Sequence, residues 1–186
     1  MTTLTSLPNM LTLMRIVLIP VFVLVFYLPF SWAPGLAAFI FAMACFTDWL
    51  DGYLARKLHQ MSPFGAFLDP VADKLLVATS LLLLVGAKEL SYLTIPAIII
   101  VGREIVISAL REWMAEVGSR ASITVNNIGK IKTAIQMLAL FLLLAFSPVT
   151  SWWGVIGFIL LYLAAILTIW SMVIYIMIAW PQLMKK

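Results

Sequence analysis

The stretch TDWLDGYLARKLHQMSPFGAFLDPVADK, residues 47–74, decides how this chain folds, because it places charge between two strongly apolar segments. It holds four of the eight acidic residues of the chain: Asp48, Asp51, Asp69 and Asp73. At about 100° per residue each pair shares one helix face, the first pair about 60° apart and the second about 40° apart. Gly52 and Ala55 fall within roughly 40° of Asp48. A ligand or ion can therefore approach that backbone closely.

The composition is that of an integral membrane protein. The 186 residues are 64% hydrophobic and 11% charged, with a mean hydropathy of +1.11. This is more apolar surface than a soluble domain of this size needs. The single Cys45 and the single His59 exclude an intrachain disulfide and a multi-Cys or His-rich metal site. Arg15 interrupts the first apolar run and no small-residue cleavage site follows, so we expect the N-terminus to be retained.

Six apolar segments are long enough to cross a bilayer, which needs about 20 helical residues per crossing. They run over roughly 11–30, 33–55, 67–87, 92–115, 131–147 and 152–180. We therefore predict an all-α integral membrane protein with six transmembrane helices in one domain, 1–186. Residues 1–10, with Leu4 and Leu7 at helical spacing, are compatible with a short N-terminal interfacial helix or with a frayed end.

Basic residues indicate the orientation of these predicted helices. The loops after the first, third and fifth apolar segments hold Lys88 alone. Eleven of the twelve basic residues lie at the N-terminal end, around the other two loops and in the tail: Arg15, Arg56, Lys57, Lys74, Arg103, Arg111, Arg120, Lys130, Lys132, Lys185 and Lys186. The positive-inside rule then places both termini and the acidic stretch at the cytoplasmic face. We expect the protein in a bacterial cell membrane, with its active site facing the cytoplasm.

The acidic pairs should meet, because a short loop makes the second and third predicted helices antiparallel neighbours. Carboxylate oxygens without His or Cys suit hard divalent cations such as Mg²⁺ or Mn²⁺. Four carboxylates can hold two cations, and two cations can clamp a phosphate during in-line displacement. Pro70 directly after Asp69 also predicts that the third helix begins there, with Asp69 as its N-cap. Capping accounts for Asp69 and at most one other aspartate, and charges within membrane segments are costly, which favours a functional site.

The spacing D-x2-D-G-x2-A-R-x8-G-x3-D-x3-D is met in full by Asp48, Asp51, Gly52, Ala55, Arg56, Gly65, Asp69 and Asp73. It resembles the signature of the CDP-alcohol phosphotransferases, membrane enzymes of phospholipid synthesis. The resemblance implies a six-helix fold, usually dimeric, with a polar cavity open to the cytoplasm, two divalent metals and a catalytic motif at 48–73.

The same resemblance implies roles for these residues. Asp48, Asp51 and Asp69 would bind one metal, and Asp48, Asp69 and Asp73 would surround the second. Asp73 would also be the catalytic general base that takes the proton of the acceptor hydroxyl. Gly52, Ala55 and Gly65 would leave room for the cytidine nucleotide, and Arg56 would hold its diphosphate.

A second, basic group of residues follows in the fourth and fifth predicted helices. Arg103 and Glu104 lie deeper than topology alone requires, so we expect them to face a cavity and to pair with polar groups. A basic pocket facing the carboxylates would hold an anionic acceptor or a lipid headgroup. The candidates for the acceptor phosphate are Arg103, Arg111, Lys130, Lys132 and Arg15.

Two further patterns resemble one branch of the same family. They are R-E-I…L-R…G-K-x-K-T…Q, from Arg103 to Gln136, and the opening P-N-x-L-T-x-x-R, from Pro8 to Arg15. In that branch a phosphatidyl group passes from CDP-diacylglycerol to sn-glycerol 3-phosphate, giving phosphatidylglycerophosphate and CMP. The last two predicted helices add only apolar character.

These residues do not identify the acceptor substrate, since an inositol phosphate enzyme would need the same basic pocket. Serine is a further acceptor to be tested. A cation transporter with carboxylates along its path is the competing class of protein, but its acidic groups should lie near the bilayer midplane. The expected partners are CDP-diacylglycerol, glycerol 3-phosphate and membrane lipids, with no nucleic acid. A homodimer is expected from the family alone.

Overall fold

The computed structural model describes residues 7–57, 62–87, 92–116, 127–146 and 151–183. They form six helices: α1 (Leu7–Phe26), α2 (Ala33–Lys57), α3 (Pro63–Gly86), α4 (Thr94–Glu116), α5 (Asn127–Ala145) and α6 (Trp152–Leu183). No strand occurs in this described part of the chain. The predicted all-α class, with one helix for each of the six apolar segments, is confirmed.

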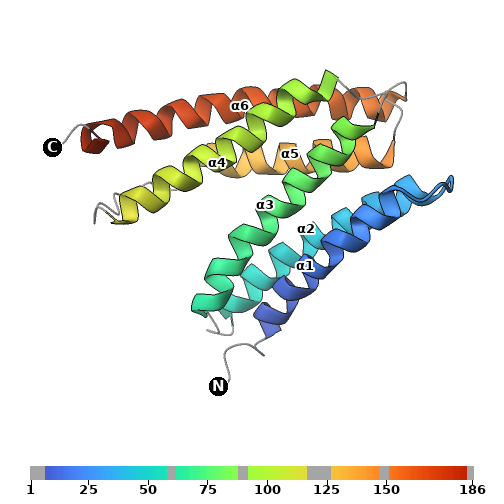
Figure 1. Cartoon of the computed structure of the whole chain (residues 1–186), viewed down its shortest axis with the longest axis horizontal. Coiled ribbons are helices and arrows are strands. Elements are labelled where there is room, and N and C mark those ends of the chain that lie inside the picture. The colour runs from blue at the N-terminus through green and yellow to red at the C-terminus, as the bar shows by residue number, and fades with distance from the viewer. Residues whose placement is uncertain (1–6, 58–61, 88–91, 117–126, 147–150, 184–186) are drawn as a thin grey trace.

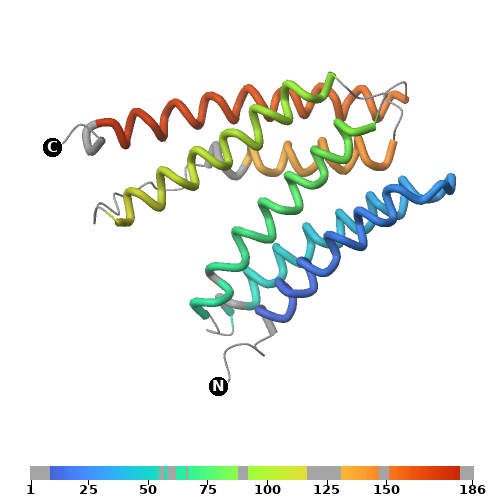
Figure 2. Tube along the Cα trace, viewed as in Figure 1, coloured from blue at the N-terminus to red at the C-terminus, as the bar shows by residue number. Residues whose placement is uncertain are grey.

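The helices form two groups that meet in a V (Figure 1). In the first group α1 packs along α2 and against α3; in the second α6 packs along α5 and against α4. Contacts of α2 with α5 and of α3 with α4 join the groups. The tube of Figure 2 shows the N-terminal ends of α1 and α3 and the C-terminal ends of α2, α4 and α6 toward the open side of the V. These are the ends that carry most of the charged residues.

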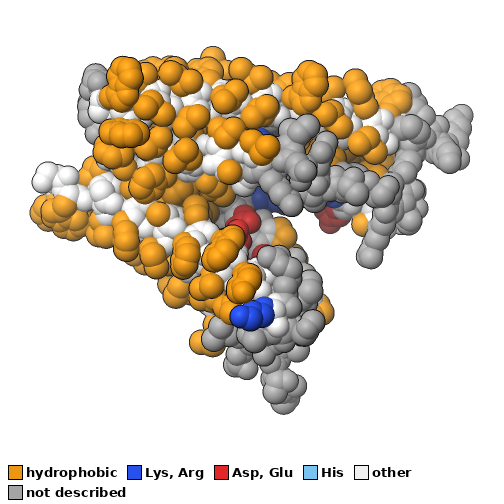
Figure 3. Space-filling view, turned by 180° about the vertical axis from the view of Figure 1, so that it is seen from behind, with side chains coloured by type: hydrophobic (Ala, Val, Ile, Leu, Met, Phe, Trp, Pro, Cys, Tyr) orange, Lys and Arg blue, Asp and Glu red, His pale blue; other side chains and the backbone are white. Residues whose placement is uncertain are grey.

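Close packing inside each group rests on small and branched side chains. Phe22 of α1 lies against Phe41 of α2, with ring centroids 6.4 Å apart, and alanines of α2 beside them are buried. In the second group, Leu140 and Leu143 of α5 and Leu161 of α6 are buried in the hydrophobic core. Many larger apolar side chains instead face outward and cover much of the described surface (Figure 3). An apolar exterior of this kind is what a lipid environment requires, since lipid tails do not penalise it.

Within the described residues, three helical segments are long and apolar enough to cross a membrane: Asn9–Phe26, Ala33–Leu54 and Trp152–Trp180. A shorter apolar helix covers Ile131–Ala145. α3 and α4 do not qualify by the same measure of length and composition, and both carry charged side chains within the helix. The apolar helices support an integral membrane protein, and the number of crossings is considered below.

The predicted start of the first long helix differs from the structure. α1 already begins at Leu7, so the later part of the expected interfacial segment belongs to the first long helix, and residues 1–6 lie outside the described part of the chain. His59 also lies outside it.

The prediction that Asp69 is the N-cap of α3 is wrong. α3 begins at Pro63, and Ser62 is the N-cap, with φ −117° and ψ 148° and a side chain that accepts a hydrogen bond from the backbone N–H of Gly65 at 3.0 Å. The Ser-Pro pair supplies a capping hydroxyl followed by a residue whose missing N–H costs nothing at the first helical position. Pro70 therefore lies inside the helix, and Asp69 projects from its second turn.

Candidate active site

The two acidic pairs converge, and they do so on helix α1. Asp48, Asp51, Asp69 and Asp73 are called the aspartate cluster below. The guanidinium of Arg15 reaches three of its members: Nη1 lies 2.9 Å from Asp48 Oδ1 and 3.0 Å from Asp73 Oδ1, and Nη2 pairs with Asp51 Oδ2. α2 and α3 therefore bring their carboxylates together, as the spacing predicted. That α1 would hold them was not predicted.

The remaining carboxylate is held by the same helix. Thr12 Oγ1 donates a hydrogen bond to Asp69 Oδ1 at 2.6 Å and lies 3.4 Å from Asp51 Oδ2. Three residues earlier, Asn9 Oδ1 accepts a hydrogen bond of 2.9 Å from Ser62 Oγ. Asn9, Thr12 and Arg15 are all buried. The side of α1 that faces α2 and α3 is thus a polar strip that fixes both acidic helices.

The aspartate cluster has more negative than positive charge. Among the described side chains, one guanidinium pairs with three of the four carboxylates. Asp48 and Asp73 keep 41% of their side-chain surface exposed, whereas Asp51 keeps 2%. The donors are all oxygens, the ligand type that Mg²⁺ and Mn²⁺ prefer. In type and in charge the cluster therefore fits a hard divalent cation.

In this structure the carboxylates are spaced around the guanidinium of Arg15 and not around a metal ion. Within the residues that the structure describes, no three acidic, His or Cys side chains stand where they could hold a metal ion. Arg15, fully buried, pairs with three of the four carboxylates. Its Nε is also buried and has no hydrogen-bond partner.

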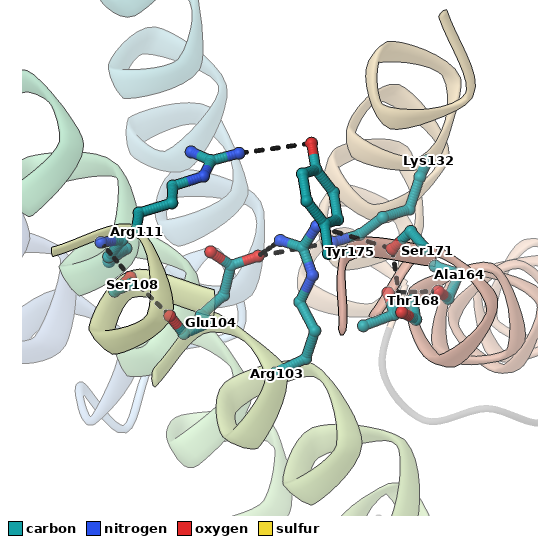
Figure 4. A network of polar contacts seen from close by, with 10 residues as sticks. Arg103, Glu104, Ser108, Arg111, Lys132, Ala164, Thr168, Ser171 and Tyr175 are labelled. Carbon is teal, nitrogen blue, oxygen red and sulfur yellow. Dashed lines mark hydrogen bonds and ion pairs between the residues drawn. The ribbon is translucent and has the colours of Figure 1, made fainter. Parts of the chain in front are cut away.

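A basic group lines a pocket of about 220 Å³ next to the cluster. Arg103 Nη1 lies 2.7 Å from Glu104 Oε1, and Lys132 Nζ lies 3.4 Å from the same oxygen (Figure 4). The expectation that Arg103 and Glu104 face a cavity and pair with polar groups is confirmed. Asp73 belongs to the lining of this pocket as well. Figure 3 shows acidic and basic side chains together in the hollow between the two helix groups.

Helix α6 also contributes to this basic group. The sequence interpretation missed the contribution of α6. Arg111 Nη2 donates to Tyr175 Oη at 3.3 Å, and the guanidinium carbons of Arg111 and Arg103 lie 5.5 and 5.8 Å from the centre of the Tyr175 ring. Arg103 Nη2 also lies 3.5 Å from Ser171 Oγ, as Figure 4 shows. Ser171 and Tyr175 are four residues apart and share a helix face, a polar pattern in an otherwise apolar segment that could have revealed them.

The other predicted residues fall in different places. Arg15 does not line the basic pocket and is engaged by the aspartate cluster instead. Gly52 is half-buried in α2, next to Asp51. The side chains of Ala55, Arg56 and Lys130 lie outside the described part of the chain, so their predicted roles stay predictions.

Gly65 is packed against α1 in this structure. A Cβ atom at this position would lie 2.6 Å from Asn9 Oδ1 and 3.2 Å from Ser62 Oγ. The space that the missing side chain leaves is thus taken up by Asn9, in the turn that also caps α3. Gly65 contributes close packing of α1 on α3 here.

The substitution Gly65→Ala should lower stability. The added methyl group must push Asn9 out of a buried position, and overpacking of this kind costs about 1–3 kcal/mol. Gly102→Ala is the matched control, since its Cβ position has no described atom within 4 Å apart from its own turns of helix and Ala favours a helix interior by up to about 1 kcal/mol. The measurement is the melting temperature of both variants in detergent. Equal melting temperatures would contradict the packing described for Gly65.

Comparison with known proteins gives consistent matches over almost the whole chain. The sequence model of the CDP-alcohol phosphatidyltransferase family matches residues 5–180. A protein of Pseudomonas fluorescens named CDP-diacylglycerol–glycerol-3-phosphate 3-phosphatidyltransferase is 54% identical over 179 residues, 96% of this chain and 92% of its own length. Proteins with the same name from Pectobacterium atrosepticum and Salmonella typhi are 53% and 51% identical, each over 97% of this chain and 98% of their own lengths.

Proposed function

The chain belongs to the CDP-alcohol phosphatidyltransferase family, and from this premise we infer that it transfers the phosphatidyl group of CDP-diacylglycerol to sn-glycerol 3-phosphate. The products are phosphatidylglycerophosphate and CMP. The primary hydroxyl oxygen of the acceptor forms a bond to the phosphorus that carries the diacylglycerol. The bond from that phosphorus to the CMP oxygen breaks, and the hydroxyl proton passes to a carboxylate. The family and the named relatives support this reaction and its two substrates.

One observation of the structure carries the proposal for the site. Asp73 belongs both to the aspartate cluster, through Arg15, and to the lining of the pocket that holds Arg103 and Lys132. A carboxylate at this junction lies between the place for a cation-bound diphosphate and the place for an anionic acceptor. Asp73 is thus our general base, since a base must reach the proton that it removes.

The aspartate cluster is the place we propose for two divalent cations, Mg²⁺ or Mn²⁺. Asp48, Asp51 and Asp69 would hold one, and Asp48, Asp69 and Asp73 the other, as the family resemblance implies. Such cations supply charge neutralisation of the diphosphate, so that an approaching hydroxyl is no longer repelled. The support from the structure is the all-oxygen donor set, its excess of negative charge and the exposure of Asp48 and Asp73.

The remaining contacts divide between the two substrates. We propose that Gly52, Ala55 and Arg56, on the C-terminal turns of α2, lie along the cytidine diphosphate, with Gly65 keeping α1 close. Arg103, Arg111, Lys130 and Lys132 would receive the acceptor phosphate, because an acceptor that brings its own phosphate needs cations there. Arg15 faces the aspartate cluster, so we no longer include it among the acceptor ligands.

The protein is an integral membrane protein, in line with its long apolar helices. We propose that all six helices cross the membrane, with both termini and the open side of the V at the cytoplasmic face. The positive-inside distribution of basic residues supports this orientation. α3 and α4 can span despite their charges if these face the interior of the bundle. The homodimer remains an expectation from the family.

The direct test is CMP release by the purified protein. With Mg²⁺ and CDP-diacylglycerol, release should require sn-glycerol 3-phosphate, and inositol, inositol phosphate and serine in parallel assays should not replace it. Release with another of these acceptors and not with glycerol 3-phosphate would overturn the acceptor while keeping the family chemistry. Absence of CMP with every acceptor would overturn the proposed reaction as a whole.

Arg111 and Tyr175 offer a test of the acceptor side. Arg111→Ala removes a cation that faces Tyr175 near the pocket, so the KM for glycerol 3-phosphate should rise about tenfold, the loss of one charge-assisted hydrogen bond. Tyr175→Phe keeps the ring beside both guanidinium groups but removes the hydroxyl that Arg111 contacts, and should raise the same KM about twofold. The KM for CDP-diacylglycerol should change little in both variants.

Lys57→Ala is the control for a general loss of positive charge. Lys57 is an exposed residue at the end of α2 and stacks on Tyr53, 5.6 Å from its ring centre, away from the basic pocket. The KM of the Lys57→Ala variant for glycerol 3-phosphate should match that of the unmodified protein. A rise in the KM for the lipid donor alone, in the Arg111 variant, would show that this arginine serves the other substrate.

A further inference from the structure

Arg15 is the most deeply buried charged residue in the described part of the chain, with no exposed surface. It comes from α1, outside the acidic motif, and it bridges carboxylates of both α2 and α3. A buried guanidinium needs such partners, because an unpaired charge in a membrane protein interior is very costly. The three carboxylates equally need a cation, since they would repel one another without it.

The oxygens that Arg15 engages are among those that a divalent cation would need. They are Asp48 Oδ1, Asp51 Oδ2 and Asp73 Oδ1, and all three residues belong to the proposed metal ligands. A guanidinium offers its donors in a rigid plane, so it spaces the carboxylates differently from a spherical ion. This agrees with the finding that no three described acidic side chains are placed to hold a metal ion.

Two further features indicate that the pairing with Arg15 can be exchanged. Its Nε is buried without a hydrogen-bond partner, so this arrangement leaves one donor of the guanidinium unsatisfied, which is uncommon for a buried polar atom. Asp48 and Asp73, moreover, keep 41% of their side-chain surface exposed. An ion can therefore approach these two carboxylates from the surface.

We propose that Arg15 is the internal counter-ion of the metal-free aspartate cluster, a positioning residue that competes with the divalent cations for the same carboxylate oxygens. This inference rests on the proposed metal site. Arg15 keeps α2 and α3 together before metal binds, and its guanidinium releases at least part of its contacts when metal enters. Metal affinity is then lowered by the guanidinium, and the metal-free protein is stabilised by it.

The test compares Arg15→Gln with the unmodified protein by measurements that do not depend on activity. In detergent with a chelator, Arg15→Gln should melt about 5 °C or more lower, because three carboxylates lose the guanidinium with which they pair. Mn²⁺ should raise the melting temperature of the variant by more than that of the unmodified protein. Mn²⁺ affinity, measured by electron paramagnetic resonance of the free ion, should be about tenfold tighter in the variant.

Arg103→Gln is the matched control, because Arg103 is also largely buried and paired with a carboxylate, but outside the cluster. Its Mn²⁺ affinity should stay unchanged. Weaker Mn²⁺ binding in Arg15→Gln, or an equal loss of melting temperature with and without Mn²⁺, would overturn the competition. If the unmodified protein does not bind Mn²⁺, the proposed metal site itself fails, and this inference with it.

If Arg15→Gln does not fold even with Mn²⁺ present, the Mn²⁺ affinity of Arg15→Lys tests the proposal instead. A single ammonium group covers fewer carboxylate oxygens than the guanidinium fork, so Mn²⁺ should bind this variant more tightly than the unmodified protein. An unchanged or weaker affinity would overturn the proposal.

Discussion

Asp73→Asn should lower the rate of CMP release by about 10²- to 10⁴-fold, the usual contribution of a general base, while the protein stays folded. The amide has nearly the same volume as the carboxylate but cannot take the acceptor proton. It still offers Arg15 an oxygen at the position of the 3.0 Å contact. The fall should appear in kcat, since the residues that receive the acceptor phosphate are unchanged. The measurement is kcat and both KM values, with melting temperature as the check on folding.

Glu112→Gln is the control for this experiment. It removes an acidic group on α4 that is exposed and has no place in the aspartate cluster, so kcat should be preserved. A kcat for Asp73→Asn within about twofold of the unmodified protein would remove Asp73 from the role of base, given the size of such contributions.

The fold was predictable where a long apolar run is the dominant signal. Such a run can satisfy its backbone inside a membrane only as a helix, so six runs give six helices. The start of α3 was missed because two capping signals compete within eight residues. Ser62-Pro63 and Asp69-Pro70 have the same form, and only the structure shows that Ser62 caps the helix.

The site was predictable only as far as local spacing reaches. The acidic pairs lie on two helices joined by a short loop, so their meeting follows from the chain order. The contacts that complete the site join residues far apart in the sequence, such as Arg15 with Asp51, 36 positions apart, and Arg111 with Tyr175, 64 positions apart. Spacing along one helix cannot show such pairs. A polar residue inside an apolar helix is the available signal, and it marks Thr12, Arg15 and Ser171.

Removal of divalent cations should abolish the reaction. With a chelator in excess, CMP release should fall by at least about 10³-fold, because several kcal/mol of charge stabilisation are lost and each 1.36 kcal/mol is a factor of ten. Added Mg²⁺ or Mn²⁺ should restore the rate, and K⁺ at matched ionic strength should not. The assay is CMP release from CDP-diacylglycerol and glycerol 3-phosphate by one preparation, before chelation, after it and after the ion is returned.

The charges in the structure explain why the loss should be so large. Among the described side chains, one guanidinium pairs with three carboxylates of the cluster and a hydroxyl holds the fourth, so without further cations the cluster should repel the diphosphate of the lipid donor. The basic pocket should not compensate, because Arg103 and Lys132 already pair with Glu104, and we propose that they receive the acceptor phosphate. Exposed carboxylates of Asp48 and Asp73 give the ions an open route in and out, so the effect should be reversible. Undiminished release in the presence of the chelator would contradict the proposed metal site.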